Sequence, residues 1–166
     1  MLPQARKLVA PDEGTTILEG GFGVVLKLAG VETGGSFSVV EHPLAPGVLG
    51  SPPHTHTNEY SSSFVVEGTV GVMVGEDVYE AGTGSYVIKP RGIPHAFWNS
   101  GPEPARIVEI ISPAGFEQYF EELARAPSAG GPPDVSRLEE IAARYGLTFH
   151  LERMGEIMER YGVGLG

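Results

Sequence analysis

Short runs of β-branched and aromatic residues, separated by turn residues, fill the chain from about residue 15 to residue 113. The runs that we predict as strands are residues 23–28, 36–41, 62–67, 70–74, 77–80, 85–88, 95–99 and 106–111. Valine, isoleucine, phenylalanine and tyrosine, which favour strands, dominate these runs. Gly68-Thr69 and Gly75-Glu76 have the composition of hairpin turns. Many short strands at this spacing predict an all-β sandwich or barrel.

The hydrophobic period changes after Pro113. Phe116, Tyr119, Phe120 and Leu123 recur at helical spacing, which predicts an amphipathic helix over residues 115–125. A Pro- and Gly-rich break follows at 127–133, and then residues 137–146 and 153–162 share one pattern, which indicates either two short helices covering the sheet or a docking surface. We therefore divide the chain into an N-terminal arm (1–14), a β-barrel (15–113) and a C-terminal helical extension (114–166).

Composition and charge exclude several classes of function. The 166 residues carry a net charge of −10, spread along the chain, which argues against a nucleic-acid backbone as partner. The absence of cysteine excludes disulfides and thiolate ligands, so any metal must be held by nitrogen and oxygen donors. No apolar run approaches 18 residues and the first residues lack an apolar signal core. We expect a cytoplasmic protein that binds a small molecule and neither a membrane nor nucleic acid.

Three histidines carry the candidate chemistry. His54 and His56 are two residues apart, so on a strand both project to the same face. His95 follows about 40 residues later, which is far enough for the chain to return along a neighbouring strand. The sequence therefore predicts a site in which these three imidazoles hold a divalent transition metal. The metal could be Fe, Ni, Cu, Zn or Mn, because imidazole suits several of these ions.

Two glycine- and histidine-containing motifs resemble those of the cupin superfamily. The second motif is complete, and its residues are Gly84, Pro90, Gly92, His95 and Asn99. The first motif contains Gly47 or Gly50, then His54, His56 and Gly68. The segment from Ser112 onward is similar to small single-domain bacterial cupins resembling quercetin 2,3-dioxygenases. The resemblance implies an antiparallel jelly-roll barrel with C-terminal helices, which usually forms a homodimer, and metal ligation by the motif histidines. His42 and His150 lie outside both motifs and are not expected to be ligands.

The first motif departs from the family pattern at one ligand. The resemblance implies a glutamate five residues after His56, and that position is Ser61. Two arrangements remain open. Glu59, which shares a strand face with Ser61, could serve as the fourth ligand and as the base that accepts a substrate proton. Alternatively, only His54, His56 and His95 bind the metal, and water completes its coordination.

The residues around the histidines predict a largely apolar pocket. Phe97 shares a strand face with His95 and should line the cavity, and we also name Phe64 as a pocket residue. Trp98 faces the other way, so we expect it to pack beneath helix 115–125 or in a dimer contact. We predict a mononuclear metal-dependent dioxygenase acting on a small enolisable or phenolic substrate. The alternatives are a non-catalytic small-molecule-binding protein and a metal-assisted isomerase or lyase.

Overall fold

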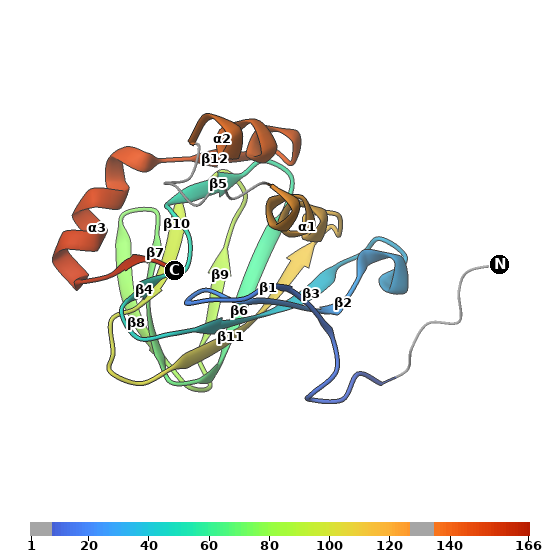
Figure 1. The fold of residues 1–166 in the computed structure, drawn as a ribbon, viewed down its shortest axis with the longest axis horizontal. Coiled ribbons are helices and arrows are strands. Elements are labelled where there is room, and N and C mark those ends of the chain that lie inside the picture. Colours follow the sequence, from blue (N-terminus) through green and yellow to red (C-terminus); the bar gives the residue numbers. More distant parts are fainter. Residues whose placement is uncertain (1–7, 127–134) are drawn as a thin grey trace.

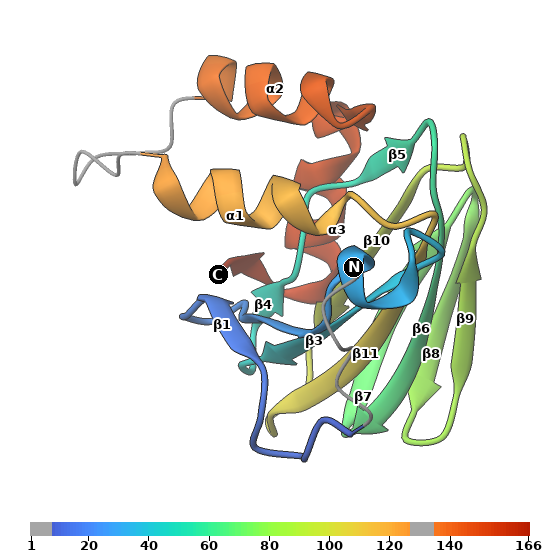
Figure 2. The same cartoon turned by 90° about the vertical axis from the view of Figure 1, so that its right-hand side faces the viewer.

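Two β-sheets face one another, with three helices gathered on one side of the molecule (Figures 1 and 2). This computed structural model describes residues 8–126 and 135–166. The first sheet has the order β1 (Thr15–Leu18), β2 (Val24–Leu28), β3 (Ser38–Leu44), β11 (Ala105–Ser112), β6 (Tyr60–Glu67) and β9 (Tyr86–Lys89). The second contains β12 (Leu147–Phe149), β5 (His54–His56), β10 (His95–Asn99), β4 (Val48–Leu49) and β13 (Gly164–Leu165), with β7 (Thr69–Val74) and β8 (Asp77–Gly82) attached through β10.

The predicted all-β class with C-terminal helices is confirmed. Each of the eight predicted strand runs overlaps an observed strand, and almost all pairings are antiparallel. Strand β5 agrees with the extended backbone expected at His54–His56, and four strands were not predicted, namely β1, β4, β12 and β13. They contain two to four residues each, too few to show a period of two in the sequence. Their pairing partners, which lie far away in the chain, make them strands.

The residues after Pro113 form helices α1 (Glu117–Arg125), α2 (Val135–Arg144) and α3 (Met154–Tyr161). A single 3₁₀ turn, Leu151–Arg153, precedes α3, and another, Gly30–Thr33, follows β2. The same segment also extends the second sheet, because β12 pairs with β5 and β13 lies parallel to β4. The predicted break at 127–133 falls outside the described residues. None of the described helices is long and apolar enough to cross a membrane.

Alternation along the strands separates an inner face from an outer one. In β11, Ile107, Glu109 and Ile111 are buried, whereas Ile110 is exposed. In β10 both faces are buried, because α3 covers the outer one: Trp98 packs against Tyr161 with ring centroids 4.5 Å apart. The expectation that Trp98 packs beneath helix 115–125 was therefore wrong. Helix α1 lies elsewhere, with its aromatic residues over the space between the sheets.

Candidate metal centre

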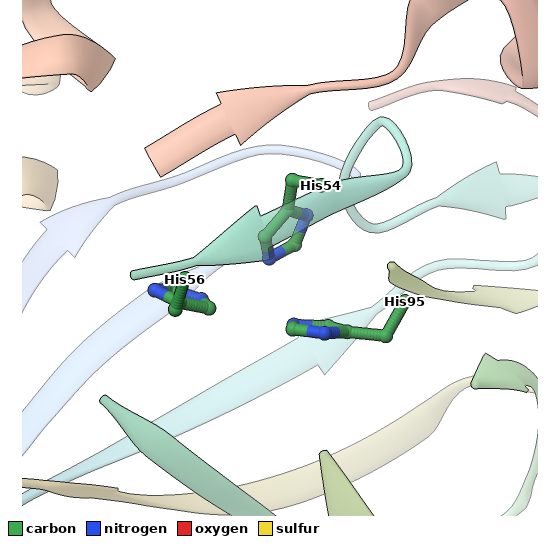
Figure 3. A group of neighbouring side chains, drawn as sticks. All are labelled: His54, His56 and His95. Carbon is green, nitrogen blue, oxygen red and sulfur yellow. The ribbon is translucent and has the colours of Figure 1, made fainter. Parts of the chain in front are cut away.

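The imidazoles of His54, His56 and His95 converge between the sheets (Figure 3). His54 and His56 project from the same face of β5, and β10 places His95 directly opposite His54 in the antiparallel register. One nitrogen from each ring lies within 4.8 Å of the others, and all three residues are buried. This is the arrangement that the spacing of the histidines predicts.

Backbone carbonyls orient two of the three rings. Nδ1 of His54 lies 2.8 Å from the carbonyl oxygen of Pro52, and Nδ1 of His95 lies 3.0 Å from that of Ile93. A carbonyl can only accept, so each Nδ1 carries the proton and each Nε2 keeps its lone pair. Nε2 of His95 is buried and has no hydrogen-bond partner among the described residues. An unpaired buried acceptor beside two other imidazoles fits a bound metal ion.

The electrostatic surroundings keep the imidazoles of His54 and His95 neutral, which is the form that binds metals. Burial, together with the neighbouring His95 and His56, lowers the pKa of His54 well below its usual value. Burial and the Lys89 ammonium lower the pKa of His95 to about 3. Protons therefore do not compete with a metal for these two rings near neutral pH. A divalent transition ion fits the donor set, and which ion it is stays open.

The Glu59 carboxylate lies beside His56, outside the group of three donors. Its Oε2 is 3.4 Å from Nδ1 of His56, and the residue is only 7 % exposed. Because Nδ1 of His56 faces this carboxylate, Nε2 is the nitrogen left for a metal. Both atoms are buried and make no hydrogen bond within the described part of the chain, so the carboxylate lies close to the ring without a formed hydrogen bond. This arrangement does not place Glu59 as a fourth ligand, and Glu59 is not among the residues that line the cavity.

A cavity of about 480 Å³ opens beside His54 and His56. Phe97 lines it, as expected, and Phe116, Tyr119 and Phe120 of the α1 region supply further aromatic wall. Gly50 allows the Phe97 ring its position, because a Cβ at residue 50 would lie 2.3 Å from that ring.

The prediction that Phe64 lines the pocket was wrong. Phe64 lies on the outer face of β6 against the exposed Tyr86, with ring centroids 4.7 Å apart. The register of β6 turns Ser61, Ser63 and Val65 inward instead. Ser61, the position at which the family pattern places a glutamate, is thus buried and inward-facing.

A charged cluster that sequence reasoning missed forms part of the cavity wall. Nζ of Lys89 lies 2.6 Å from Oε1 of Glu109, and Nε2 of His42 lies 3.3 Å from Oε2 of the same carboxylate. All three side chains are buried and line the cavity. The available signal was Glu109 itself, a charge between Ile107 and Ile111 in the otherwise apolar alternate set of the predicted strand 106–111. His42 belongs to this cluster, not to the histidine trio.

Two serines make room for this cluster. Strand β6 lies between β9 and β11, with Ser61 opposite Lys89 and Ser63 opposite Glu109. Because both serines face inward and are small, the Lys89 side chain can reach across β6 to the carboxylate. Burial by itself would raise the pKa of Glu109, but the Lys89 charge and the hydrogen bond from His42 outweigh burial and hold that pKa well below its usual range.

The remaining histidine lies apart from both clusters. Nε2 of His150 is 3.3 Å from Oγ1 of Thr55, and Nδ1 is 3.7 Å from the Glu152 carboxylate. Its side chain is 28 % exposed, which makes His150 a useful control position.

Comparison with known proteins agrees with the fold and the histidine motif. A family model described as "Cupin domain" matches residues 40–111. Germin-like protein 5-1 from Oryza sativa is 36% identical over 94 residues, which are 53% of this chain and 41% of the relative. The chain thus spans about two fifths of the length of the curated relative that it matches.

Solved structures of similar fold come from several bacteria. An RmlC-like cupin from Shewanella frigidimarina has a TM-score of 0.58 and 19% identity, over 71% of this chain and 99% of that one. A predicted oxalate decarboxylase from Thermotoga maritima has a TM-score of 0.58 and 16% identity, over 63% and 97%. The polyketide cyclase RemF from Streptomyces resistomycificus has a TM-score of 0.55 and 23% identity, over 64% and 79%. At these identities the likeness concerns the fold alone.

The narrower resemblance to quercetin 2,3-dioxygenases is not confirmed by these comparisons. The family model nevertheless covers both histidine-containing motifs and most of the two-sheet core. Residues 40–111 therefore match the cupin domain model, and the two-sheet fold is shared with the RmlC-like cupin.

Proposed function

We propose that this protein is a cupin and a mononuclear metal-dependent dioxygenase of a small enolisable or phenolic substrate. The observation that carries the proposal is the convergence of three buried imidazoles, two of which, His54 and His56, line a largely apolar cavity. His54, His56 and His95 would hold the ion through Nε2, and Glu59 would orient His56. When bound, a divalent ion supplies Lewis acidity toward an anionic oxygen and, if it is redox-active, electron transfer.

The rest of the cavity supports substrate binding. Phe97, Phe116 and Phe120 offer apolar surface that excludes water and packs on an unsaturated or aromatic substrate. The hydroxyl of Ser61 is no substitute for a carboxylate as a base, because it stays un-ionised near neutral pH. Glu109 is a buried carboxylate that lines the cavity and can exchange a proton with a substrate there.

The same cluster favours a second candidate function, a metal-assisted isomerase or lyase. Glu109 sits between two proton-bearing groups, the Lys89 ammonium and the His42 imidazole. Such a set can remove a proton from one atom of a substrate and return it to another without any oxidant. Isomerisation and elimination need this, whereas dioxygenation needs dioxygen.

The test is metal analysis followed by substrate assays with and without oxygen. We expect about one iron, nickel or copper per chain in protein purified without added metal, and substrate-dependent oxygen uptake with a panel of diketones and flavonols. Product formed under argon would favour the isomerase or lyase. Tight binding without turnover in air or argon would refute both and indicate a non-catalytic binding protein. His95→Ala should abolish metal retention, with His150→Ala as the matched control.

The expected homodimer is also a proposal. The outer face of the first sheet exposes Tyr86, Ile88 and Ile110, which is apolar surface of the kind that subunit interfaces cover. Light scattering on the purified protein would give the mass. A monomer at micromolar concentration would refute the dimer.

A further inference from the structure

The Lys89 ammonium borders a largely apolar cavity and has N–H groups that make no hydrogen bond within the described part of the chain. Lys89 is 2 % exposed, and its ammonium makes one hydrogen bond within the described part of the chain, to Glu109. An ammonium carries three N–H groups, so two remain for another acceptor. The Nζ atom also lies 5.4 Å from the centroid of the Phe97 ring, which helps to hold the cation at the cavity wall.

A purely structural role explains this cation poorly. A buried ion pair stabilises a fold no better than a packed apolar pair, so its presence calls for a further reason. Here the pair borders open volume, and that volume also reaches His54 and His56. The cavity therefore has two buried electropositive places once a metal is bound, whereas Arg137, which also lines it, is exposed.

We infer that Lys89 binds a second anionic oxygen of the substrate, at a distance from the oxygen that faces the histidine trio. The site would then select small, mainly apolar molecules with two acidic oxygen functions, such as a catechol or enol that also bears a carboxylate. Glu109 and His42 are positioning residues in this arrangement, because they anchor Lys89 and keep it charged. The inference rests on the proposed metal site but not on the reaction performed there.

Matched probes separate this role from a structural one. The first probe is 4-methylcatechol, whose two oxygens can face a metal and whose methyl group is neutral. The others are 3,4-dihydroxybenzoate and 3,4-dihydroxyphenylacetate. They replace that methyl group with a carboxylate, which is attached to the ring directly in the first and through one CH₂ group in the second. Dissociation constants would be measured by calorimetry on Ni²⁺-loaded protein. We expect wild type to prefer at least one carboxylate probe by at least about tenfold, which is about 1.4 kcal/mol.

The variant is chosen to remain folded. Lys89→Met combined with Glu109→Gln leaves a neutral pair of similar size. It should lose the preference for the carboxylate probe, measured as the ratio of its affinity to that of 4-methylcatechol, while keeping its nickel content. Equal preference in wild type and in the double variant, or none in wild type, would overturn the inference.

Failure of the metal site would look different. If 4-methylcatechol does not bind to nickel-loaded wild type, or if His95→Ala keeps its nickel, the proposed function fails. Loss of probe selectivity in the double variant with nickel content intact concerns Lys89 alone. The two hypotheses are thus distinguished within one set of measurements.

Discussion

Removing Lys89 alone should destabilise the fold by leaving a buried charge without its main partner. Glu109 is 6 % exposed, and its Oε1 is 2.6 Å from the lysine Nζ. Two unit charges at this distance attract by about 6 kcal/mol at an effective dielectric constant of about 20, which offsets the cost of taking both out of water. Breaking such a pair costs about 3–5 kcal/mol. We expect the low end for Lys89→Met, about 3 kcal/mol, because Nε2 of His42 remains 3.3 Å from the carboxylate.

The assay is denaturant unfolding of metal-free protein, followed by the fluorescence of Trp98, the single tryptophan. In a thermal unfolding experiment on the same protein, a loss of about 3 kcal/mol would appear as a fall of about 6–12 °C in Tm for a chain of this size. Lys89→Met combined with Glu109→Gln should return to within about 1 kcal/mol of wild type, because no buried charge is then left unpaired. Single-variant losses that simply add in the double variant would refute the reasoning.

The pH dependence of this loss gives a second check. In wild type the Glu109 pKa lies well below its usual range, so its stabilising contribution is present near neutral pH and is lost only as the pH falls through that low value. In Lys89→Met, only His42 opposes the effect of burial on the Glu109 carboxyl, so the pKa of Glu109 should rise. Protonation of Glu109 then removes the buried charge as the pH falls. The stability difference between the two proteins should therefore shrink on acidification. A constant difference from pH 7 to pH 4 would contradict this account.

Three further predictions concern the metal site and the packing around it. Metal-free protein should lose stability as the pH falls from 6.5 toward about 3, at about 1–3 kcal/mol per pH unit, because unfolded imidazoles take up protons there whereas His54 and His95, with lowered pKa values, do not. A flat unfolding profile over this range would contradict it. Glu59→Gln should retain the metal but bind it about 10–100-fold more weakly in a chelator competition, as expected for a carboxylate that orients a ligand; complete loss would instead indicate direct ligation. Gly71→Ala should lower the free energy of unfolding by about 1–3 kcal/mol in chemical denaturation, because the new Cβ would lie 2.2 Å from Nε1 of the buried Trp98. Gly82→Ala is the matched control, because its Cβ would meet nothing closer than 3.8 Å.

The fold class and the metal-binding trio could be predicted because their signals are local. The pattern His-x-His requires only that residues 54–56 be extended, and β5 is extended. The inward position of Phe97 follows from its spacing to His95 within one strand. Phe64 was misplaced because its facing depends on how β6 pairs with β9 and β11 after the Ser61 region, and the sequence of β6 alone does not specify that register.

The sequence by itself determined that His54 and His56 would share a face, since alternation along a single strand is enough to decide that, and the motif resemblance indicated that His95 would join them. Only the tertiary structure decided what stands around them. Lys89, Glu109 and His42 come from three different strands, and their contact depends on the register across β6 and on two small serines that leave room for it. The position of Glu59 behind His56 was decided in the same way, because it depends on how the chain turns between β5 and β6 and not on residue type. Contacts between strands are set by pairing over long sequence distances, and no short pattern in the chain encodes them.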